Sequence, residues 1–403
     1  MTTTSLKTVS PARPPLTASW TAPVLDAARV HRELDRLWKE WNEDRRGEED
    51  AALHAYEGAL MRASTLNLIV VVETLAEAEE IELVVGELIE FSPSRTVILV
   101  RNGRKAAGLH IRVSVHEHLQ GRGRPAIQRE SVTVAAKEGS DHILASVTTP
   151  LLVPELPGFL YLPRFLRAEG PLLQDLLRIA DRLIVDSATA TDPSRTLRSL
   201  ANLTQDETGP RLSDVVWTRL TAWRQLIAQF FDQGVTQPCL EALDDVEIVC
   251  GKWDGDGRCG LTAGLLMAGW LATRLGWRAP GELVHAREGW RLTLRAGPRG
   301  RSREVLLRLR MTDHPPACGG LSSVTLVAGP ECPGTFRVER TDDQAITTTS
   351  ETPTMPRVSR LVYGRQMDEP ALLSQELRNF TGDPIYEEAL VFAADLWPEG
   401  VMI

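Results

Sequence analysis

The sequence predicts an α/β plus α+β fold, in which an N-terminal mixed α/β domain is followed by a domain of helices packed on an antiparallel sheet. The chain has 403 residues, more than a single hydrophobic core usually serves, so two domains are expected. Strand-like and helix-like segments alternate over residues 63–190, and strand-like segments separated by turn signals follow one another over residues 289–361. The expected segments are a disordered leader (1–23), N-terminal helices (24–62), the mixed α/β domain (63–190), a linker (191–211) and the α+β domain (212–403).

The composition indicates a cytoplasmic protein with large apolar cores. Lys and Arg number 45 and Asp and Glu number 54, which gives a net charge of −9, and 43% of the residues are hydrophobic. Nucleic-acid binding needs a basic surface, so no nucleic-acid partner is expected. The longest apolar run, over residues 261–273, is too short for the ~20 residues of a membrane-spanning helix. Residues 1–23 are rich in Thr, Ser and Pro and lack the apolar stretch of a signal peptide, which is typical of a disordered segment.

The elements of the N-terminal domain follow from periodicity and capping. Apolar residues at helical spacing over 24–41 predict an amphipathic helix. The run 65–72 is almost wholly apolar and rich in β-branched residues, the pattern of a strand buried on both faces. Thr74 and Glu77 form a capping box, which predicts a helix to about Ile89. The remaining predicted elements are strands 95–101, 109–116 and 131–136, a helix near residue 141, a Pro-punctuated segment 150–163, a helix 171–180 and a strand 182–186.

The second domain is expected to begin after a polar segment. Residues 189–212 are rich in Ser, Thr and Asp and include Gly209 and Pro210, so the domain boundary is placed there. Residues 217–232 are predicted to form one helix, which carries two Trp, two Phe and two Arg and can be capped by Asp214 or its neighbour Ser213. The remaining predicted elements are a strand 246–250, a helix 261–275 with small residues at every fourth position, the strands of 289–361, and helices 370–379 and 383–395.

The one match to a named chemical motif is the loop Gly255-Asp-Gly-Arg-Cys-Gly260. It has the GxGxxG pattern of a dinucleotide-binding loop, lies between a predicted strand and a predicted helix, and has Glu282 about 20 residues further on. Asp254 and Asp256, however, place carboxylates where a pyrophosphate would lie, and no full doubly wound unit surrounds the loop. A turn that leads into a helix is the favoured interpretation, and a nucleotide-binding α/β enzyme is kept as the alternative.

No other pattern predicts a catalytic, cofactor-binding or metal-binding residue. His116 and His118 point to the same face of a predicted strand, and Glu117 and Glu130 are near in sequence, but no third ligand follows with a recognisable spacing. The sequence motifs of serine hydrolases, P-loop proteins and zinc proteases are absent. We therefore expect no cofactor and no enzymatic activity.

A cluster of arginines is the strongly cationic region of this acidic chain. The favoured interpretation is the charged outer face of an antiparallel sheet, and the alternative is a docking patch for an acidic partner or a phosphate metabolite, as in a sugar-phosphate sensor. The cluster, called the Arg-rich hairpin below, consists of Arg291, Arg295, Arg299, Arg301, Arg303, Arg308 and Arg310.

Six segments between residues 61 and 277 together resemble a known family. They are Thr65-Leu-Asn-Leu, Ser92-Pro-Ser-Arg95, Pro150-Leu-Leu with Leu156-Pro157, Leu183-Ile-Val-Asp-Ser187, the helix 217–232, and Ala268-Gly-Trp-Leu-Ala-Thr-Arg-Leu-Gly-Trp277. Their order and their Trp and Arg spacing resemble the glucose-6-phosphate dehydrogenase assembly proteins, the OpcA family of cyanobacteria and actinobacteria.

The resemblance implies a non-enzymatic protein that binds glucose-6-phosphate dehydrogenase. In that role it would promote the active oligomer of the enzyme and act as an allosteric activator in the oxidative pentose phosphate pathway. Because cyanobacterial members are associated with redox control, the resemblance also implies thioredoxin as a partner.

The five cysteines give little support to redox chemistry. Their number is odd, none forms a CxxC pair, and the last 70 residues contain none, which disfavours a disulfide framework, a structural zinc site and a C-terminal redox switch. A reducing compartment is therefore expected. Cys318 and Cys332 have the spacing of a hairpin, and a regulatory disulfide between them is a hypothesis that thiol titration can test.

Trp and Arg residues of the resembling segments are the candidates for the partner surface, since these residue types often dominate interfaces. For each aromatic residue, packing in the core of its own domain is the favoured alternative, whereas the arginines are expected to reach solvent. Arg95 is added because it lies in a Pro-containing segment beside a strand end. The candidates are Arg95, Trp217, Arg219, Trp223, Arg224, Trp270 and Arg274.

Overall fold

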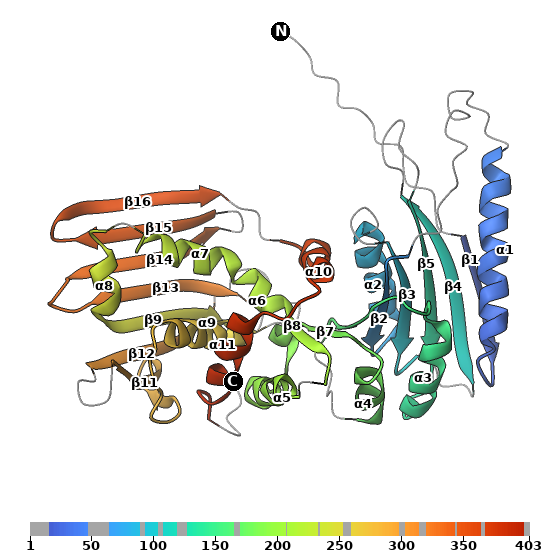
Figure 1. Cartoon of the computed structure of the whole chain (residues 1–403), viewed down its shortest axis with the longest axis horizontal. Coiled ribbons are helices and arrows are strands. Elements are labelled where there is room, and N and C mark those ends of the chain that lie inside the picture. The colour runs from blue at the N-terminus through green and yellow to red at the C-terminus, as the bar shows by residue number, and fades with distance from the viewer. Residues whose placement is uncertain are drawn as a thin grey trace, which may run out of the picture. The chain divides into compact units, whose positions relative to one another are not determined.

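The chain divides into two compact units. Unit 1 comprises residues 1–161 and 168–181, and unit 2 comprises residues 162–167 and 182–403. Figure 1 draws the computed structural model. It describes residues 16–46, 64–88, 93–103, 108–118, 127–164, 170–206, 208–232, 234–252, 259–297, 303–313, 320–342, 345–363 and 367–398.

Unit 1 contains a mixed sheet with helices on both sides. Strands β5, β3, β2 and β6 run parallel to one another, and β4 pairs antiparallel with both β5 and β1, giving the order β1-β4-β5-β3-β2-β6. The elements are β1 Leu16–Ala22, α1 Ala27–Arg46, β2 Leu66–Val72, α2 Leu75–Glu87, β3 Ser94–Val100, β4 Leu109–His118, β5 Ile127–Ala135, α3 Asp141–Thr148, β6 Gly158–Leu162 and α4 Pro171–Leu177.

Helices α1 and α2 cover opposite faces of this sheet. The indole of Trp38 on α1 donates to Glu130 of β5, whereas Glu82 on α2 accepts from the Thr133 hydroxyl of the same strand at 2.9 Å. Because odd and even residues of a strand face opposite sides, the two helices lie on different faces. Every residue of β2 is buried, which confirms the expected double burial.

The predicted start of α2 is confirmed. Thr74 is the N-cap, and its hydroxyl accepts from the Glu77 amide at 3.2 Å. The Glu77 carboxylate accepts in return from the amide of Glu73 at 2.8 Å, one residue before the N-cap. One backbone donor that the helix leaves unpaired is thereby satisfied, together with the amide of the residue before the cap.

Two strands of the unit 1 sheet were not predicted. Residues 16–22, expected to be part of a disordered leader, form β1 and pair antiparallel with β4 from Leu16 opposite Val115 to Ala22 opposite Leu109. The pairing partner lies almost 100 residues away, so the local polar composition did not reveal it. Strand β6 lies in the Pro-punctuated segment 150–163 and pairs in parallel with β2.

Unit 2 contains an eight-stranded sheet with helices over one face. The strand order of this sheet is β10-β11-β12-β9-β13-β14-β15-β16. Unit 2 also contains strands β7 and β8, which pair in parallel with each other. The elements are β7 Arg182–Val185, α5 Pro193–Thr204, β8 Arg211–Asp214, α6 Val215–Arg219, α7 Thr221–Gln229, α8 Gln237–Glu241, β9 Leu243–Gly251, α9 Leu261–Arg274, β10 Val284–Ala286, β11 Gly289–Ala296, β12 Arg303–Thr312, β13 Leu321–Ala328, β14 Gly334–Asp342, β15 Ala345–Thr352, β16 Met355–Tyr363, α10 Glu369–Arg378 and α11 Pro384–Ala394.

The alternating burial of the unit 2 strands reflects this one-sided cover. On β9, Val246 and Ile248 are buried while Glu247 and Val249 are partly exposed. Helices α7 and α9 lie against the sheet (Figure 1). Within residues 289–361, β11 pairs antiparallel with β12, and neighbouring strands from β13 to β16 also pair antiparallel, as expected. The preceding strand β9 pairs in parallel with β12, so the whole sheet is mixed. A parallel pair needs a long connection, here the segment that includes α9, β10 and β11.

Two further expectations differ from the structure. The segment 191–211, expected to be a linker, contains helix α5 and the first residue of β8. Asp192 caps α5 by accepting from the Arg195 amide at 3.1 Å, and Pro193 occupies the first turn, which explains how a polar segment begins a helix. The single helix expected over 217–232 is divided at Leu220 into α6 and α7. None of the described helices is both long and apolar enough to cross a membrane.

Candidate functional site

Helix α6 lies in a network of buried polar side chains in unit 2. Trp217 is only 5% exposed, and its indole donates to Asp383 at 2.7 Å. The Arg224 guanidinium stacks on the Trp217 ring at 3.5 Å from the ring centroid. Burial lowers the pKa of Arg224 to about 10. Two of the candidate partner residues therefore bind each other inside the unit.

The Arg219 guanidinium is held by Asp186. It donates to both carboxylate oxygens, at 3.0 and 2.9 Å, in the bidentate geometry that makes such pairs strong. Asp186 is 1% exposed and follows β7. This pair joins α6 to the end of β7, so the charge of Arg219 is largely neutralised inside unit 2.

A second buried pair joins β7 to α10. Arg182 donates to the Glu376 carboxylate at 3.0 Å and to the carbonyl oxygen of Thr381 at 2.8 Å. Glu376 also accepts from the hydroxyl of Thr218 on α6. Side chains of β7 and α6, which are far from α10 in sequence, thus share its Glu376 carboxylate.

Asp214 is a carboxylate of the network whose pKa is strongly raised. It caps α6 by accepting from the Val216 amide at 2.9 Å, and the Tyr386 hydroxyl lies 3.5 Å from its other oxygen. Burial, reinforced by the nearby Asp186 charge, raises the pKa of Asp214 to about 7, although hydrogen bonds from Ser187 and Val216 oppose the shift. Shifts of this size are common at functional sites. Here the side chains face one another and hold helix α6.

We expect Asp214→Asn to remove a pH dependence of stability. The folded-state pKa lies above the ordinary value of 3.8, so the contribution of protonated Asp214 is complete below about pH 4 and is lost as the pH rises through 7. A pKa raised by about three pH units changes the free energy of unfolding by roughly 4 kcal/mol at most. Urea unfolding at pH 5 and pH 7.5 checks this, since the variant should gain relative stability at the higher pH. A stability difference that is equal at both pH values would contradict the assignment.

A cavity of about 270 Å³ opens beside this network, between helices α6 and α7 and the sheet. Its lining includes the apolar side chains of Trp223, Leu226 and Val362. The guanidinium of Arg340 lies 5.9 Å from the centroid of the Trp223 ring, and Arg340 also lines the cavity. A largely apolar cavity with a cation in its wall could hold an apolar side chain of a polar or acidic polypeptide segment.

The other candidate residues lie in different environments. Arg95 is 4% exposed, forms an ion pair with Glu130, and donates to the carbonyl oxygen of Leu151 at 3.1 Å. Trp270 is partly exposed on α9, and Arg274 is exposed at the end of that helix, where it forms an ion pair with Glu388. The structure therefore brings Trp217, Arg219, Trp223 and Arg224 together. Arg95 lies in unit 1.

The network contains residues that the sequence did not single out as a group. They are Arg182, Asp186, Glu376 and Asp383. The local signal was weak but present, because Asp383 is the first residue of a predicted helix and Arg182 and Asp186 are the end residues of a predicted strand. Arg182 meets Glu376, and Asp383 meets Trp217, across more than 150 residues, which no spacing rule anticipates.

The described arginines of the Arg-rich hairpin lie on β11 and β12. Within the described residues, Arg308 contacts Asp245 at 2.6 Å and Arg310 contacts Glu247 at 3.5 Å. These carboxylates belong to β9, so the arginines form cross-strand ion pairs on the open face of the sheet. Arg299 and Arg301 lie outside the described residues.

The dinucleotide-loop hypothesis and the His116–His118 metal hypothesis involve some residues that the structure does not describe. Residues 253–258, including Gly255 and Gly257 of the GxGxxG loop, lie outside the described residues. The side chain of His118 is also outside them, whereas burial and the neighbouring Arg129 and Arg112 charges lower the pKa of His116 to about 3. A cationic neighbourhood is unfavourable for a metal ion. Among the described side chains, no group of three or more His, Cys, Asp or Glu residues could hold one.

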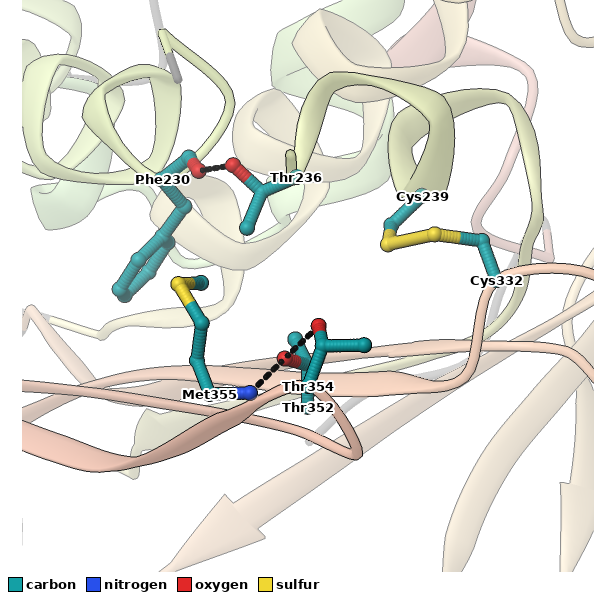
Figure 2. The surroundings of a disulfide bond; sticks show 7 residues. All are labelled: Phe230, Thr236, Cys239, Cys332, Thr352, Thr354 and Met355. Atoms are coloured by element: carbon teal, nitrogen blue, oxygen red, sulfur yellow. Dashed lines mark hydrogen bonds between the residues drawn. A yellow bond between two sulfur atoms is a disulfide. The ribbon is translucent and has the colours of Figure 1, made fainter. Parts of the chain in front are cut away.

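The hypothesis that Cys318 pairs with Cys332 is wrong, because Cys332 is bonded to Cys239. The bond joins α8 to the turn between β13 and β14, next to the hairpin of Thr352 and Met355 (Figure 2). The two cysteines are 93 residues apart in sequence, so no hairpin spacing identified them. Cys318 lies outside the described residues, and Cys250 and Cys259 are buried and free.

We expect three reactive thiols in the unfolded, unreduced chain, since five cysteines less the bonded two leaves three. After reduction all five should react. Cys239→Ser is the matched variant, and it should give four thiols with and without reductant. Five thiols in the unreduced wild-type chain would contradict the Cys239–Cys332 bond.

Comparison with known proteins gives two family matches in sequence order. Residues 85–202 match the model described as the glucose-6-phosphate dehydrogenase subunit N-terminal domain, and residues 210–390 match the corresponding C-terminal domain. The chain is 27% identical over 187 residues to a Synechocystis protein and 28% identical over 188 residues to a Nostoc punctiforme protein. Both carry the name OxPP cycle protein OpcA as a provisional assignment.

These matches cover part of each chain. The aligned residues are 46% of this chain in both cases, and 38% and 39% of the Synechocystis and Nostoc relatives. Among solved structures, a 3-ketoreductase from Actinomadura kijaniata aligns with 82% of this chain and 95% of its own, at 14% identity and a TM-score of 0.47. A similarity of that size assigns no chemistry to the chain.

Proposed function

Because the chain belongs to the OpcA family of glucose-6-phosphate dehydrogenase assembly proteins, we propose that it binds this dehydrogenase and promotes its active oligomer. In this proposal the chain is a non-enzymatic, allosteric activator in the oxidative pentose phosphate pathway. The observation that carries the proposal is the pair of family matches, which follow each other in order and are both described as parts of a dehydrogenase subunit.

The geometry of α6 supports a binding role more than a catalytic one. The polar side chains that sequence reasoning favoured are engaged with one another, as Trp217 with Asp383 and Arg219 with Asp186. Reacting groups need access to a substrate, whereas these groups fix the position of a helix. We propose that they affect partner binding through the shape of α6. Trp270, which is partly exposed, and Arg274, whose side chain is 37% exposed, remain proposed direct contacts.

The test is to mix the purified chain with the dehydrogenase of the same organism. Light scattering should report a particle heavier than either protein alone, and the initial rate at low glucose 6-phosphate should rise in parallel. No complex and no change in rate would end the proposal. Arg274→Glu should weaken the complex if Arg274 contacts the partner directly.

Two control measurements separate the alternatives. A dinucleotide that stabilises the chain against heat without the dehydrogenase would favour a nucleotide-binding enzyme, since a ligand of the native state raises its stability. Stabilisation by glucose 6-phosphate alone would favour a sugar-phosphate sensor. Thioredoxin is not part of the proposal.

A further inference from the structure

Strand β16 is an open, exposed edge of the unit 2 sheet. It is the last strand in the order and pairs only with β15 among the described strands, as the rim of the sheet in Figure 1 illustrates. Eight of its nine residues are exposed. Tyr363, Leu361, Val358 and Val362 are 78%, 47%, 39% and 38% exposed. An edge of this length and apolarity offers unpaired backbone N–H and C=O groups to another strand.

The cavity beside α7 continues toward this edge. Arg340 of β14 lies opposite Ile346 of β15, and Ile346 lies opposite Val362 of β16. All three residues line the cavity. They form one row across three strands, on the face of the sheet that α7 covers. If a strand were added along β16, its residue opposite Val362 would extend the Arg340–Ile346–Val362 row and would lie at the cavity.

The charges on β16 indicate what kind of strand fits. The strand carries Arg357 and Arg360 and no acidic residue, although the chain as a whole has a net charge of −9. Both arginines are exposed. Opposite charges on facing strands are stabilising, and like charges are not. Glu351, near the hairpin turn, is the one acidic residue of β15.

The same charges disfavour a second copy of the chain as the occupant. Antiparallel pairing of two β16 strands about Ser359 would gather two arginines from each copy and no carboxylate from either strand. Strand addition commonly draws affinity from backbone hydrogen bonds and specificity from pockets for alternate side chains. The open edge and the cavity supply these two parts.

We propose that β16 binds an extended acidic segment of a partner protein by strand addition, with one apolar side chain of that segment in the cavity lined by Val362 and Trp223. The inference rests on the proposed function for the partner, which is the dehydrogenase. It predicts a segment with carboxylates opposite Arg357 and Arg360 and one apolar anchor opposite Val362.

The first test reverses the charges of the edge. The double variant Arg357→Glu, Arg360→Glu should bind the dehydrogenase at least about tenfold more weakly than the wild-type chain, because its new carboxylates would repel the acidic groups of the partner segment. The matched control is Arg291→Glu with Arg295→Glu on β11, which changes two exposed arginines and the net charge equally. It should bind within about twofold of the wild type. Circular dichroism checks that all variants fold.

The second test addresses the cavity. Val362→Phe places a ring at the end of the row and should weaken binding, whereas Leu361→Phe, on the other face of the same strand, should not. Both positions are exposed to a similar extent, so both variants are expected to fold. Equal binding by the two variants would overturn the role of the cavity.

The outcomes separate the inference from the proposed function. If the wild-type chain binds and activates the dehydrogenase and the β16 charge variant does so equally well, the inference fails and the proposed function stands. If the wild-type chain neither binds nor activates the enzyme, both fail. A wild-type dimer that the β16 variant abolishes would overturn the assignment in favour of a second copy.

Discussion

Replacing Gly269 by alanine is expected to lower the free energy of unfolding of unit 2 by about 3 kcal/mol. Gly269 lies in α9, where a Cβ atom would lie 2.2 Å from the carbonyl oxygen of Ala389 on α11. The carbonyl carbon and Cα of Ala389 would be 3.1 and 3.3 Å away. A backbone cannot rotate aside as a side chain can, so the two helices must separate. The higher helix propensity of alanine, worth ~1 kcal/mol, offsets part of this cost.

The matched control is Gly86→Ala in α2. Gly86 is also inside a helix, but a Cβ atom there would meet nothing within 4 Å. The expected effect is a gain of about 0.5–1 kcal/mol from helix propensity alone. Urea unfolding followed by circular dichroism measures both variants. A Gly269→Ala chain as stable as the wild type would mean that α9 and α11 do not pack as closely as their backbones indicate.

The second large effect is expected from Glu376→Ala, which should destabilise unit 2 by about 3–5 kcal/mol. Arg182 and Glu376 have side chains only 3% and 7% exposed, and their charged atoms are 3.0 Å apart. Burial lowers the pKa of Arg182, and the Glu376 charge opposes this shift. Removing the carboxylate leaves a buried cation and takes an acceptor from the Thr218 hydroxyl.

The control for this prediction is Glu282→Ala in the same unit. Glu282 pairs with Arg198 at 3.3 Å, but its side chain is 49% exposed and water can replace it. The expected loss is below about 1 kcal/mol. A double variant, Arg182→Met with Glu376→Leu, should recover much of the stability that Glu376→Ala loses, because no charge is then left buried. Equal effects of Glu376→Ala and Glu282→Ala in urea unfolding would mean that the buried Arg182–Glu376 pair stabilises the protein no more than an exposed pair does.

Much of the fold could be predicted because its signals are local. The apolar run of β2, the capping box at Thr74 and the periodicity of α9 depend on neighbours within a few residues, and all three elements are present. Strand β1 and helix α5 were missed. The first is stabilised by pairing with a distant strand, and the second begins at Asp192 in a segment whose polar composition is typical of a linker.

The small residues of α9 show how much of its helix packing the sequence pattern could predict. Gly264 belongs to the predicted row of small residues, and a Cβ atom there would lie 2.8 Å from the flexible Leu309 side chain. Gly269 is outside that row, yet it makes the closer approach, to the backbone of α11. The local pattern did not identify Gly269, because its close contact is with a neighbouring helix.

The candidate site was predictable only in part. The concentration of Trp and Arg in residues 217–232 correctly marked a place of dense burial, but it did not decide between a core and an interface. The structure places Trp217 and Trp223 at 5% and 3% exposure. It leaves Val362 and Tyr363 exposed on β16, in a strand that the sequence grouped with the rest of the sheet.

The sequence by itself determined the family and most of the secondary structure, since both are written in the order and spacing of residues along the chain. The tertiary structure decided which side chains meet and which remain open to a partner. Trp217 meets Asp383 across 166 residues, and Arg182 meets Glu376 across 194. Burial and pairing are properties of such distant contacts, because a side chain is covered only by what the folded chain brings next to it.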